Sequence, residues 1–263
     1  MVKIHFLGTC SGTEPYAGMH HCSLIIEVDG INYWFDAGEC CGYTAHTLGI
    51  DIMKTKALFI SHPHIDHIGG MPHLFFCFGK LIACEKRTLI ANNTLEVFLP
   101  DMAILDAVCK MNTANAQKNY FRFHISEHKL HQGVVYEDEK VRVSTVPNTH
   151  MKNRDGSVDP RAFSFLIEAD GRRVVYSGDV GKPYELDPLL ENGADLVIKE
   201  TGHHADDDVC EYAISRGIRR LRFNHHGREI INDRAAAQKL VESYEEKADI
   251  SIKICYDGMV EEV

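Results

Sequence analysis

The sequence predicts an α/β protein with two β-sheets at its centre and helices outside them. Short apolar runs typical of strands occur in two successions along the chain, and helix-like stretches separate them. Polar residues, several of them His or Asp, directly follow many of these apolar runs. The chain has 263 residues, 44% of them hydrophobic, and it contains no repeat or linker. We therefore expect residues 1–263 to form one domain with a large core.

Two hairpins are predicted where an Asp-Gly pair separates two apolar runs, because this pair favours a tight hairpin turn. Their strands cover residues 23–28 with 31–35 and residues 163–168 with 172–177. Other strands are expected over residues 2–9, 57–60, 142–147, 196–200, 219–224 and 250–255, and helices over 206–216 and about 232–247. Residues 71–111 mix both patterns, and strands are expected again from about residue 120.

Charge and cysteine content narrow the class of protein. The formal charge is −10, and no basic run exceeds a pair of arginines or a short EKR, which argues against a protein built mainly to grip nucleic acid. Nine scattered cysteines without a CxxC pair indicate free thiols, with no disulfide partner, in a reducing cytoplasm. The first residues lack the layout of a signal peptide, and no run approaches the roughly 18 apolar residues of a membrane helix. We expect a cytoplasmic protein that does not enter a membrane.

The stretch SHPHIDHIGG, residues 61–70, predicts a metal site. His62 and His64 are two positions apart, so on an extended or turning backbone they can point the same way. Asp66 and His67 follow at once and can face a second point just beyond, an arrangement that suits two neighbouring cations. Further along the chain, other polar residues follow apolar strands in the same manner: His150, Asp179 and His225. Loops at strand ends are where an α/β scaffold places its functional groups.

These motifs resemble the metallo-β-lactamase superfamily, and within it the ribonuclease Z branch, whose members cut phosphodiesters. The likeness rests on FLGTCSGTEP, WFDAGE, HPHIDHIGGMPHLF and YSGD, and on Glu200 and Gly202-His203 followed by a helix, a strand and His225. It implies an αββα sandwich of the metallo-β-lactamase type, with two mixed sheets and outer helices.

The resemblance also implies a set of metal ligands and catalytic residues. One ion would be held by His62, His64 and His150, the other by Asp66, His67 and His225, and both by Asp179. His225 is favoured over His226 because its distance from His203 matches the family spacing. The catalytic residues implied are Asp66, His203 as the acid that protonates the leaving group, and Glu200, which orients His203. Asp36 is a candidate for the carboxylate that accepts the second N–H of a ligand histidine. An equally favoured alternative is that Asp36 only stabilises a turn.

Two divalent ions are therefore expected, zinc first, with manganese or iron as alternatives. Together they would hold a hydroxide that attacks phosphorus. The expected substrate is a small phosphodiester, such as a small or cyclic nucleotide, or a short RNA end.

Departures from the branch argue against folded tRNA as the substrate. KETG stands where the branch has a HEAT-like segment, and Asn224-His225-His226-Gly227 replaces a Thr-His-Phe-Ser type of motif. Residues 71–130 carry seven Lys and Arg against five Asp and Glu, and no Gly-Pro-rich or basic arm is evident. A tRNA 3′-processing endoribonuclease, with a basic groove on one face of a homodimer, stays an alternative. So do a lactone, thioester or β-lactam hydrolase on the same metals, and a ligand-binding protein without activity.

Overall fold

Two seven-stranded sheets form the centre of the protein. The computed structural model describes residues 1–113 and 121–263. In spatial order the first sheet consists of β14 (Val260–Glu262), β1 (Val2–Gly8), β2 (Ser23–Val28), β3 (Ile31–Phe35), β4 (Thr55–Phe59), β5 (Thr94–Leu99) and β6 (His124–Lys129). The second consists of β13 (Ser251–Ile254), β12 (Arg220–Asn224), β11 (Leu196–Glu200), β10 (Arg172–Tyr176), β9 (Phe163–Ala169), β8 (Val141–Pro147) and β7 (Gly133–Glu137). Each sheet combines parallel and antiparallel pairs.

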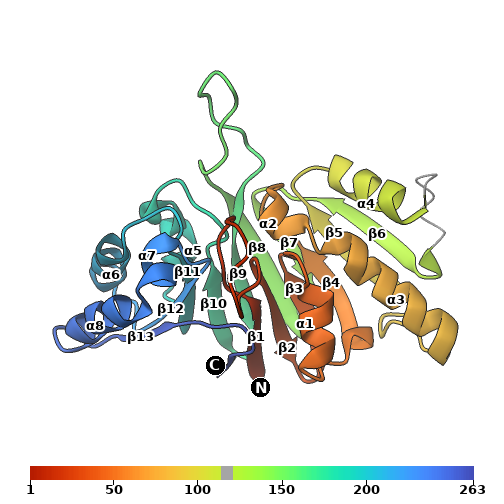
Figure 1. The fold of residues 1–263 in the computed structure, drawn as a ribbon, viewed down its shortest axis with the longest axis horizontal. Helices are drawn as coiled ribbons and strands as arrows, with labels where there is room; N and C mark the ends of the chain where they lie inside the picture. Colours follow the sequence, from red (N-terminus) through yellow and green to blue (C-terminus); the bar gives the residue numbers. More distant parts are fainter. Residues whose placement is uncertain (114–120) are drawn as a thin grey trace.

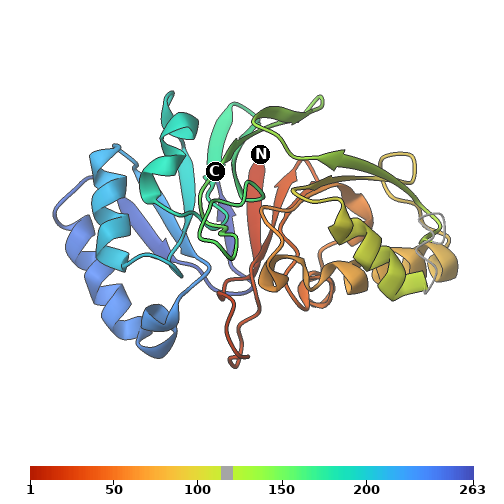
Figure 2. The same cartoon turned by 90° about the horizontal axis from the view of Figure 1, so that it is seen from above.

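Helices cover the outer face of each sheet (Figures 1 and 2). The first half of the chain supplies α1 (Cys41–Thr47), η1 (Ile52–Lys54), α2 (Ile65–Ile68), α3 (Met71–Glu85) and α4 (Ala103–Thr113). The second half supplies η3 (Pro183–Leu186), α5 (Asp187–Leu190), α6 (Asp206–Ser215), α7 (Arg228–Asn232) and α8 (Arg234–Glu245). The expected αββα arrangement with two mixed sheets is confirmed.

Three apolar layers hold this arrangement together. Between the sheets, aromatic rings from both halves meet: Phe35 stacks on Phe59 at 4.9 Å and contacts the edge of Phe165 at 5.4 Å between ring centroids. A second layer packs α1, α3 and α4 on the first sheet around Trp34, and a third packs α6 and α8 on the second sheet around Phe223. Because both faces of the central strands are covered, these strands are apolar almost throughout.

Both predicted hairpins are present, with the turn chemistry that the sequence indicated. Asp29 and Gly30 have φ values of 49° and 77°, and Asp170 and Gly171 have φ values of 50° and 71°. Two consecutive positive φ angles are the geometry of the tight turn that joins strands with a right-handed twist. The flanking strands pair antiparallel, β2 with β3 and β9 with β10.

Several elements differ from the expectations. Residues 71–111 resolve into α3, β5 and the start of α4. The short helix α7 precedes α8, which begins at residue 234. The strand over 250–255 does not close the chain: β14 follows it and pairs antiparallel with β1 in the other sheet. Tyr120, where strands were expected to return, lies outside the described residues, and β6 begins at residue 124.

The carboxyl ends of several strands meet along one edge of the sandwich. β3 runs parallel to β4, and β10 runs parallel to β11 and β12, while β8 shares the direction of β10 through two antiparallel steps. Loops that leave these strands therefore lie close together, which is where open α/β sheets bind ligands. The segment between β8 and β9 projects above this edge (Figure 1). No helix within residues 1–113 or 121–263 is long and apolar enough to cross a membrane.

Candidate metal centre

A single helical turn at the end of β4 places the first four polar side chains. The chain leaves β4, turns at residues 61–64 and forms α2, with His64 extended at φ −67° and ψ 148° before the turn. Asp66 and His67 lie within α2, and both are buried. The turn packs closely on the loop after β3: a Cβ atom at Gly70 would lie 2.0 Å from the Gly38 carbonyl oxygen. Only glycine therefore fits at this contact.

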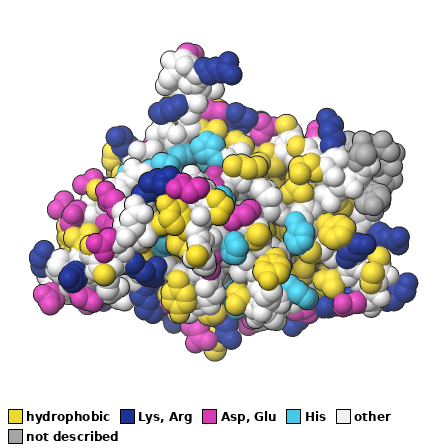
Figure 3. Space-filling model, viewed as in Figure 1, with side chains coloured by type: hydrophobic (Ala, Val, Ile, Leu, Met, Phe, Trp, Pro, Cys, Tyr) yellow, Lys and Arg dark blue, Asp and Glu magenta, His cyan; other side chains and the backbone are white. Residues whose placement is uncertain are grey.

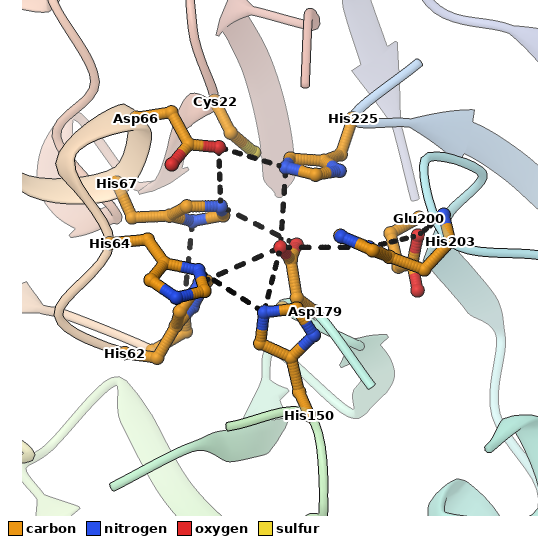
Figure 4. Close-up of polar contacts among 12 residues, drawn as sticks. Cys22, His62, His64, Asp66, His67, His150, Asp179, Glu200, His203 and His225 are labelled. Carbon is orange, nitrogen blue, oxygen red and sulfur yellow. Dashed lines mark hydrogen bonds and ion pairs between the residues drawn. The ribbon is translucent and has the colours of Figure 1, made fainter. Parts of the chain in front are cut away.

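One group of ligand atoms gathers His62, His64, His150 and Asp179 (Figure 4). The Nε2 atom of His62 lies 3.0 Å from Nδ1 of His64 and 3.5 Å from Oδ2 of Asp179. Nε2 of His150, from the loop after β8, lies 3.2 Å from the same His64 nitrogen and 3.6 Å from Asp179. Three imidazole nitrogens thus point at one small volume.

A second group gathers Asp66, His67, His225 and again Asp179. Nε2 of His225, which follows β12, lies 3.2 Å from Asp66 and 3.3 Å from Asp179, in each case to Oδ2. Nε2 of His67 lies 3.5 Å from Asp66 Oδ2 and 3.4 Å from Asp179 Oδ1. Within each group the ligand atoms all lie within 4.8 Å of one another. The Asp179 carboxylate, at the end of β10, belongs to both.

Burial and neighbouring charges set the protonation of these groups, and the result for His62 and His150 differs from that for His67. Burial lowers the pKa of His62 well below its usual value and the pKa of His150 to about 4, so both imidazoles are neutral, as a ligand must be. Burial would raise the pKa of Asp179, but His225 and His67 outweigh it and hold that pKa well below the usual range. Burial likewise would lower the pKa of His67, but Asp179 and Asp36 raise it well above the usual value.

Two buried atoms at the centre of the cluster are left without a hydrogen bond. Nε2 of His67 and Oδ1 of Asp179 are both fully shielded from solvent, and neither forms a hydrogen bond with a described residue. Buried polar atoms without partners are rare because each costs free energy. Imidazole nitrogens and carboxylate oxygens that face one another in this way are the donor set that zinc and similar divalent ions prefer.

Asp36 fixes one of these histidines from behind. Its Oδ2 atom lies 2.8 Å from Nδ1 of His67 and accepts hydrogen bonds from the hydroxyls of Ser61 and Tyr176, at 2.8 and 2.6 Å. Its Oδ1 atom accepts the backbone N–H of Ser61 at 2.7 Å. Ligand histidines usually donate their second N–H to such a carboxylate, which sets the orientation of the ring. Asp36 reaches this position from a left-handed backbone, with φ 59°.

The side chains of the adjacent residues His225 and His226 point in different directions. His225 has φ 50° and points into the second ligand group, with its Nδ1 atom beside Gly202, where a Cβ atom would lie only 2.7 Å away. His226 points elsewhere: its Nε2 atom lies 2.9 Å from the Cys255 carbonyl oxygen, and the side chain is fully buried. His225 is therefore the one of the pair that faces the cluster.

Beside the ligand groups, Glu200 at the end of β11 holds His203. Oε2 of Glu200 accepts the backbone N–H of His203 at 3.0 Å and lies 3.3 Å from its Nδ1 atom. The hydrogen bond to Glu200 raises the pKa of His203, while burial opposes the rise. The His203 side chain is 41% exposed and its Nδ1 atom lies 3.8 Å from Asp179 Oδ2. An imidazole whose pKa is raised by a carboxylate thus lies at the edge of the cluster.

A cavity of about 440 Å³ opens onto this cluster. Histidine side chains gather at the base of the projecting segment on the face seen in Figure 3. Besides the ligand residues, the cavity is lined by residues that our sequence reasoning did not single out: Ser11, Thr13, Gly227 and Arg228. Arg228 pairs with Glu14 at 2.6 Å. The motif FLGTCSGTEP contained two of these four residues, and proximity of the chain to His225 was the only signal for the others.

The sequence and the fold have relatives with this architecture. Residues 2–209 match the protein family described as Anti-Pycsar protein Apyc1. The chain belongs to that family. Ribonuclease Z of Methanothermobacter thermautotrophicus is 25% identical, with 86% of each chain covered. The metallo-β-lactamase fold protein YhfI of Bacillus subtilis has a TM-score of 0.72 at 17% identity, covering 99% of this chain and 98% of its own. The short form of human tRNase Z has the same score, identity and coverage.

These comparisons confirm the likeness to the metallo-β-lactamase superfamily and to its ribonuclease Z-like branch. The chain is a metal-dependent hydrolase with that fold. All nine cysteines lie in the described part of the chain, and none of them forms a disulfide there.

Proposed function

We propose that this protein is a phosphodiesterase that uses two divalent metal ions, zinc first among them, on a small nucleotide-like substrate. The observation that carries the proposal is the pair of ligand groups that share Asp179, with the His203 ring at their edge. Ligands come from loops after β4, β8, β10 and β12, so both halves of the chain contribute. We accordingly treat residues 1–263 as one catalytic unit.

In this proposal His62, His64 and His150 would hold one ion, Asp66, His67 and His225 would hold the other, and Asp179 would be available to both. Two such ions, when bound, supply Lewis acidity toward the phosphate and acidify a water at neutral pH. Manganese and iron accept the same nitrogen and oxygen donors and are alternatives to zinc.

The protein's own groups handle the leaving oxygen. An alkoxide is a poor leaving group, so breaking its bond to phosphorus requires a proton at that oxygen. His203 is placed to supply it, because Glu200 orients the ring and raises its pKa. A positioned general acid contributes about 10² to 10⁴ in rate. Asp66, held by His225 and His67, is the third residue of the proposed catalytic set.

The size of the cavity favours a small substrate. Its volume of about 440 Å³ lies within the roughly 300–1,000 Å³ of small-molecule sites. The loop between β1 and β2 contributes Ser11 and Thr13 to its wall. The segment between β8 and β9, which includes His150, projects from the same edge of the sandwich (Figure 1). A mononucleotide or cyclic nucleotide matches these dimensions better than a folded RNA.

A second candidate is endonucleolytic processing of RNA 3′ ends. The observation in its favour is that the curated relative from Methanothermobacter, which the chain matches over 86% of its length, is named Ribonuclease Z. In this case the short 3′ end of the RNA would enter the cavity while the folded part stayed outside.

Turnover of bis(p-nitrophenyl) phosphate tests the proposed chemistry. Protein stripped of metal with a chelator should be inactive, and two equivalents of zinc or manganese per chain should restore turnover. The variant Asp66→Ala should stay inactive after metal is added back. Full activity in the stripped protein, or no turnover with two ions bound, would refute the proposed reaction.

A substrate panel then separates the two candidates. The four common 3′,5′-cyclic nucleoside monophosphates and a precursor tRNA with a 3′ trailer are offered to the same metal-loaded protein. We expect hydrolysis of at least one cyclic nucleotide and no cleavage of the trailer. Cleavage of the trailer alone would favour the second candidate.

A further inference from the structure

A fully buried lysine contacts Glu200, the carboxylate that holds the proposed proton donor His203. Lys199 occupies the next-to-last position of β11, in a strand otherwise made of apolar residues and Glu200, and its side chain is 1% exposed. A buried ammonium group is costly unless it is paired, because burial removes its hydration. Neither ligand group includes Lys199. The burial of Lys199 therefore costs free energy, and the reaction steps proposed above do not use this residue.

The partner of Lys199 is the carboxylate that holds His203. Nζ of Lys199 donates to the backbone carbonyl of Glu200 at 2.9 Å and lies 3.3 Å from its Oε1 atom. Nε2 of His204 approaches the same Oε1 atom, at 3.2 Å. Oε2 is thereby left to His203, which meets it through both its backbone N–H and its ring. The two oxygens of Glu200 thus have separate tasks.

We propose that Lys199 is a positioning residue for the reaction: it anchors Oε1 of Glu200 so that Oε2 faces His203 and fixes the ring that protonates the leaving oxygen. The proposal deepens the function proposed above and rests on the role given there to His203. Without the lysine, a carboxylate that is 2% exposed would lose its closest cation and would turn or take up a proton.

The surrounding charges favour this arrangement. Burial lowers the pKa of Lys199, and Glu200 first, then Asp179 and Glu185, oppose that shift. These carboxylates favour the charged form of the lysine, and Glu200, which Lys199 contacts, contributes most.

Two substrates with different leaving groups distinguish positioning from simple stabilisation. p-Nitrophenolate leaves readily without a proton, whereas the alkoxide released from 3′,5′-cyclic AMP needs one. We expect Lys199→Met to lower kcat on cyclic AMP by about 10-fold or more and kcat on bis(p-nitrophenyl) phosphate by less than about 2-fold. His203→Ala should show the same pattern.

Arg222 supplies a matched control. It is equally buried, lies on the adjacent strand β12 and pairs with Glu261 away from the cavity. Arg222→Met should leave the ratio of the two activities unchanged even where it lowers stability. Equal losses on both substrates in Lys199→Met would overturn the proposal and leave the lysine a structural role.

A second readout does not depend on activity. Long-range ¹H–¹⁵N spectra of metal-free protein, recorded at a pH above the His203 pKa, report which nitrogen of the neutral His203 ring carries the proton. We expect one tautomer in the wild type, protonated at Nδ1 toward Glu200, and a mixture of tautomers in Lys199→Met. An unchanged His203 spectrum would overturn the proposal. If the wild type hydrolyses neither bis(p-nitrophenyl) phosphate nor any of the four cyclic nucleotides, the proposed function fails, and the His203 spectrum alone decides the role of Lys199. If it hydrolyses a cyclic nucleotide other than cyclic AMP, that nucleotide replaces cyclic AMP in the comparison.

The single variant leaves Glu200 buried without its cation and can fail to fold for that reason. The double variant Lys199→Met/Glu200→Gln removes both charges together and guards against this outcome. We expect it to fold and to show the same selective loss on cyclic AMP. A double variant that keeps wild-type turnover of cyclic AMP would contradict the proposal.

Discussion

Asp36 joins the two halves of the protein through a single carboxylate. The residue leaves β3 of the first sheet, is fully buried, and accepts a hydrogen bond from Tyr176 at the end of β10 in the second sheet. The same Oδ2 atom faces His67. A charged acceptor with several donors in a low-dielectric interior is a rigid anchor, because each bond restricts the others. The position of His67 therefore depends on a residue that lies across the sandwich.

Tyr176→Phe should weaken metal binding without changing any ligand. The substitution removes the 2.6 Å hydrogen bond to Asp36 and leaves the carboxylate freer to move. We expect metal affinity or activity to fall by about 10-fold or more and stability to fall by about 1–3 kcal/mol. Zinc titration against a competing chelator and urea unfolding measure the two effects.

Tyr33→Phe is the matched control for this substitution. Tyr33 is also buried between the sheets and donates to a carboxylate, Asp138, at 2.8 Å, but that carboxylate contacts no member of the ligand groups. Its stability loss should be similar and its zinc affinity unchanged. Equal zinc affinities in Tyr176→Phe and wild type would show that Asp36 needs no help from the tyrosine.

At the scale of elements, β14 ties the second sheet to the first. It pairs with β1, and its Glu261 carboxylate accepts from Arg220 and Arg222 on β12 and lies 3.0 Å from Lys253 on β13. Burial would raise the pKa of Glu261, but hydrogen bonds from Arg222, Arg220 and Lys253 outweigh it and lower the pKa to about 2. The ion pairs of Glu261 thus hold the three-residue strand β14 at the edge of the first sheet.

Glu261→Gln should destabilise the protein in a pH-dependent manner. A carboxyl whose pKa falls on folding contributes stability above its unfolded pKa of about 4.3, and this contribution is lost as pH falls toward 2. At pH 7 we expect a loss on the order of 3 kcal/mol, since Arg222 stays buried without its partner. Urea unfolding at several pH values measures the difference in unfolding free energy between wild type and Glu261→Gln. This difference should be constant from pH 7 to about 5 and become smaller below.

The neighbouring residue on the same strand provides the control. Glu262 is exposed and lies 3.9 Å from Lys3. Glu262→Gln should change stability by less than about 0.5 kcal/mol at any of these pH values. A gap between Glu261→Gln and wild type that stayed constant down to pH 3 would exclude the charged cluster as its cause.

Local signals explain which elements the sequence could predict. The Asp-Gly hairpins depend on the conformations of two residues, and β4 depends on a short apolar run, so neighbouring residues were sufficient. β14 could not be found in this way, because the three residues VEE form a strand only against β1, at the far end of the chain. Residues 71–111 were ambiguous because α3 and β5 are both covered by the same apolar layer, which weakens their periodic patterns.

The sequence predicted the side chains of the candidate site, and the structure showed how deeply each of them is buried. His62 to His67 were evident from their spacing, and His150, Asp179 and His225 from their places after apolar strands. The division of these residues between two ions, and the role of His203, needed the resemblance to a family. Tyr176 and Lys199 were missed, because their significance lies in contacts across the sheets or beneath the site. The ligand roles, the homodimer and the cytoplasmic location stay predictions.

At the scale of the whole molecule, the proposed ions connect the two sheets and should stabilise the fold. A ligand that binds only the folded state raises its stability by about 2.7 kcal/mol at 100 times its dissociation constant. For a chain of this size we expect chelation to lower the Tm by about 5–10 °C. Asp179→Asn, which alters the carboxylate common to both groups, should abolish most of this difference.

Differential scanning calorimetry with and without chelator measures the effect, and metal analysis counts the ions. An unchanged Tm in the wild type after two equivalents of metal are removed would mean that the ions do not bridge the halves. The variant Glu262→Gln, which leaves every ligand intact, should keep the full difference.

The pairing of β1 with β14 also sets an order of assembly during synthesis. β1 is made before β14, yet until residues 260–262 leave the ribosome β1 offers an open edge to other strands. Pairing between such distant segments is slow, since a long loop must close before the contact forms. The nascent chain therefore passes through a stage in which the β1 edge of the first sheet has no pairing strand. This edge is open to chaperones and to aggregation until β14 pairs with it.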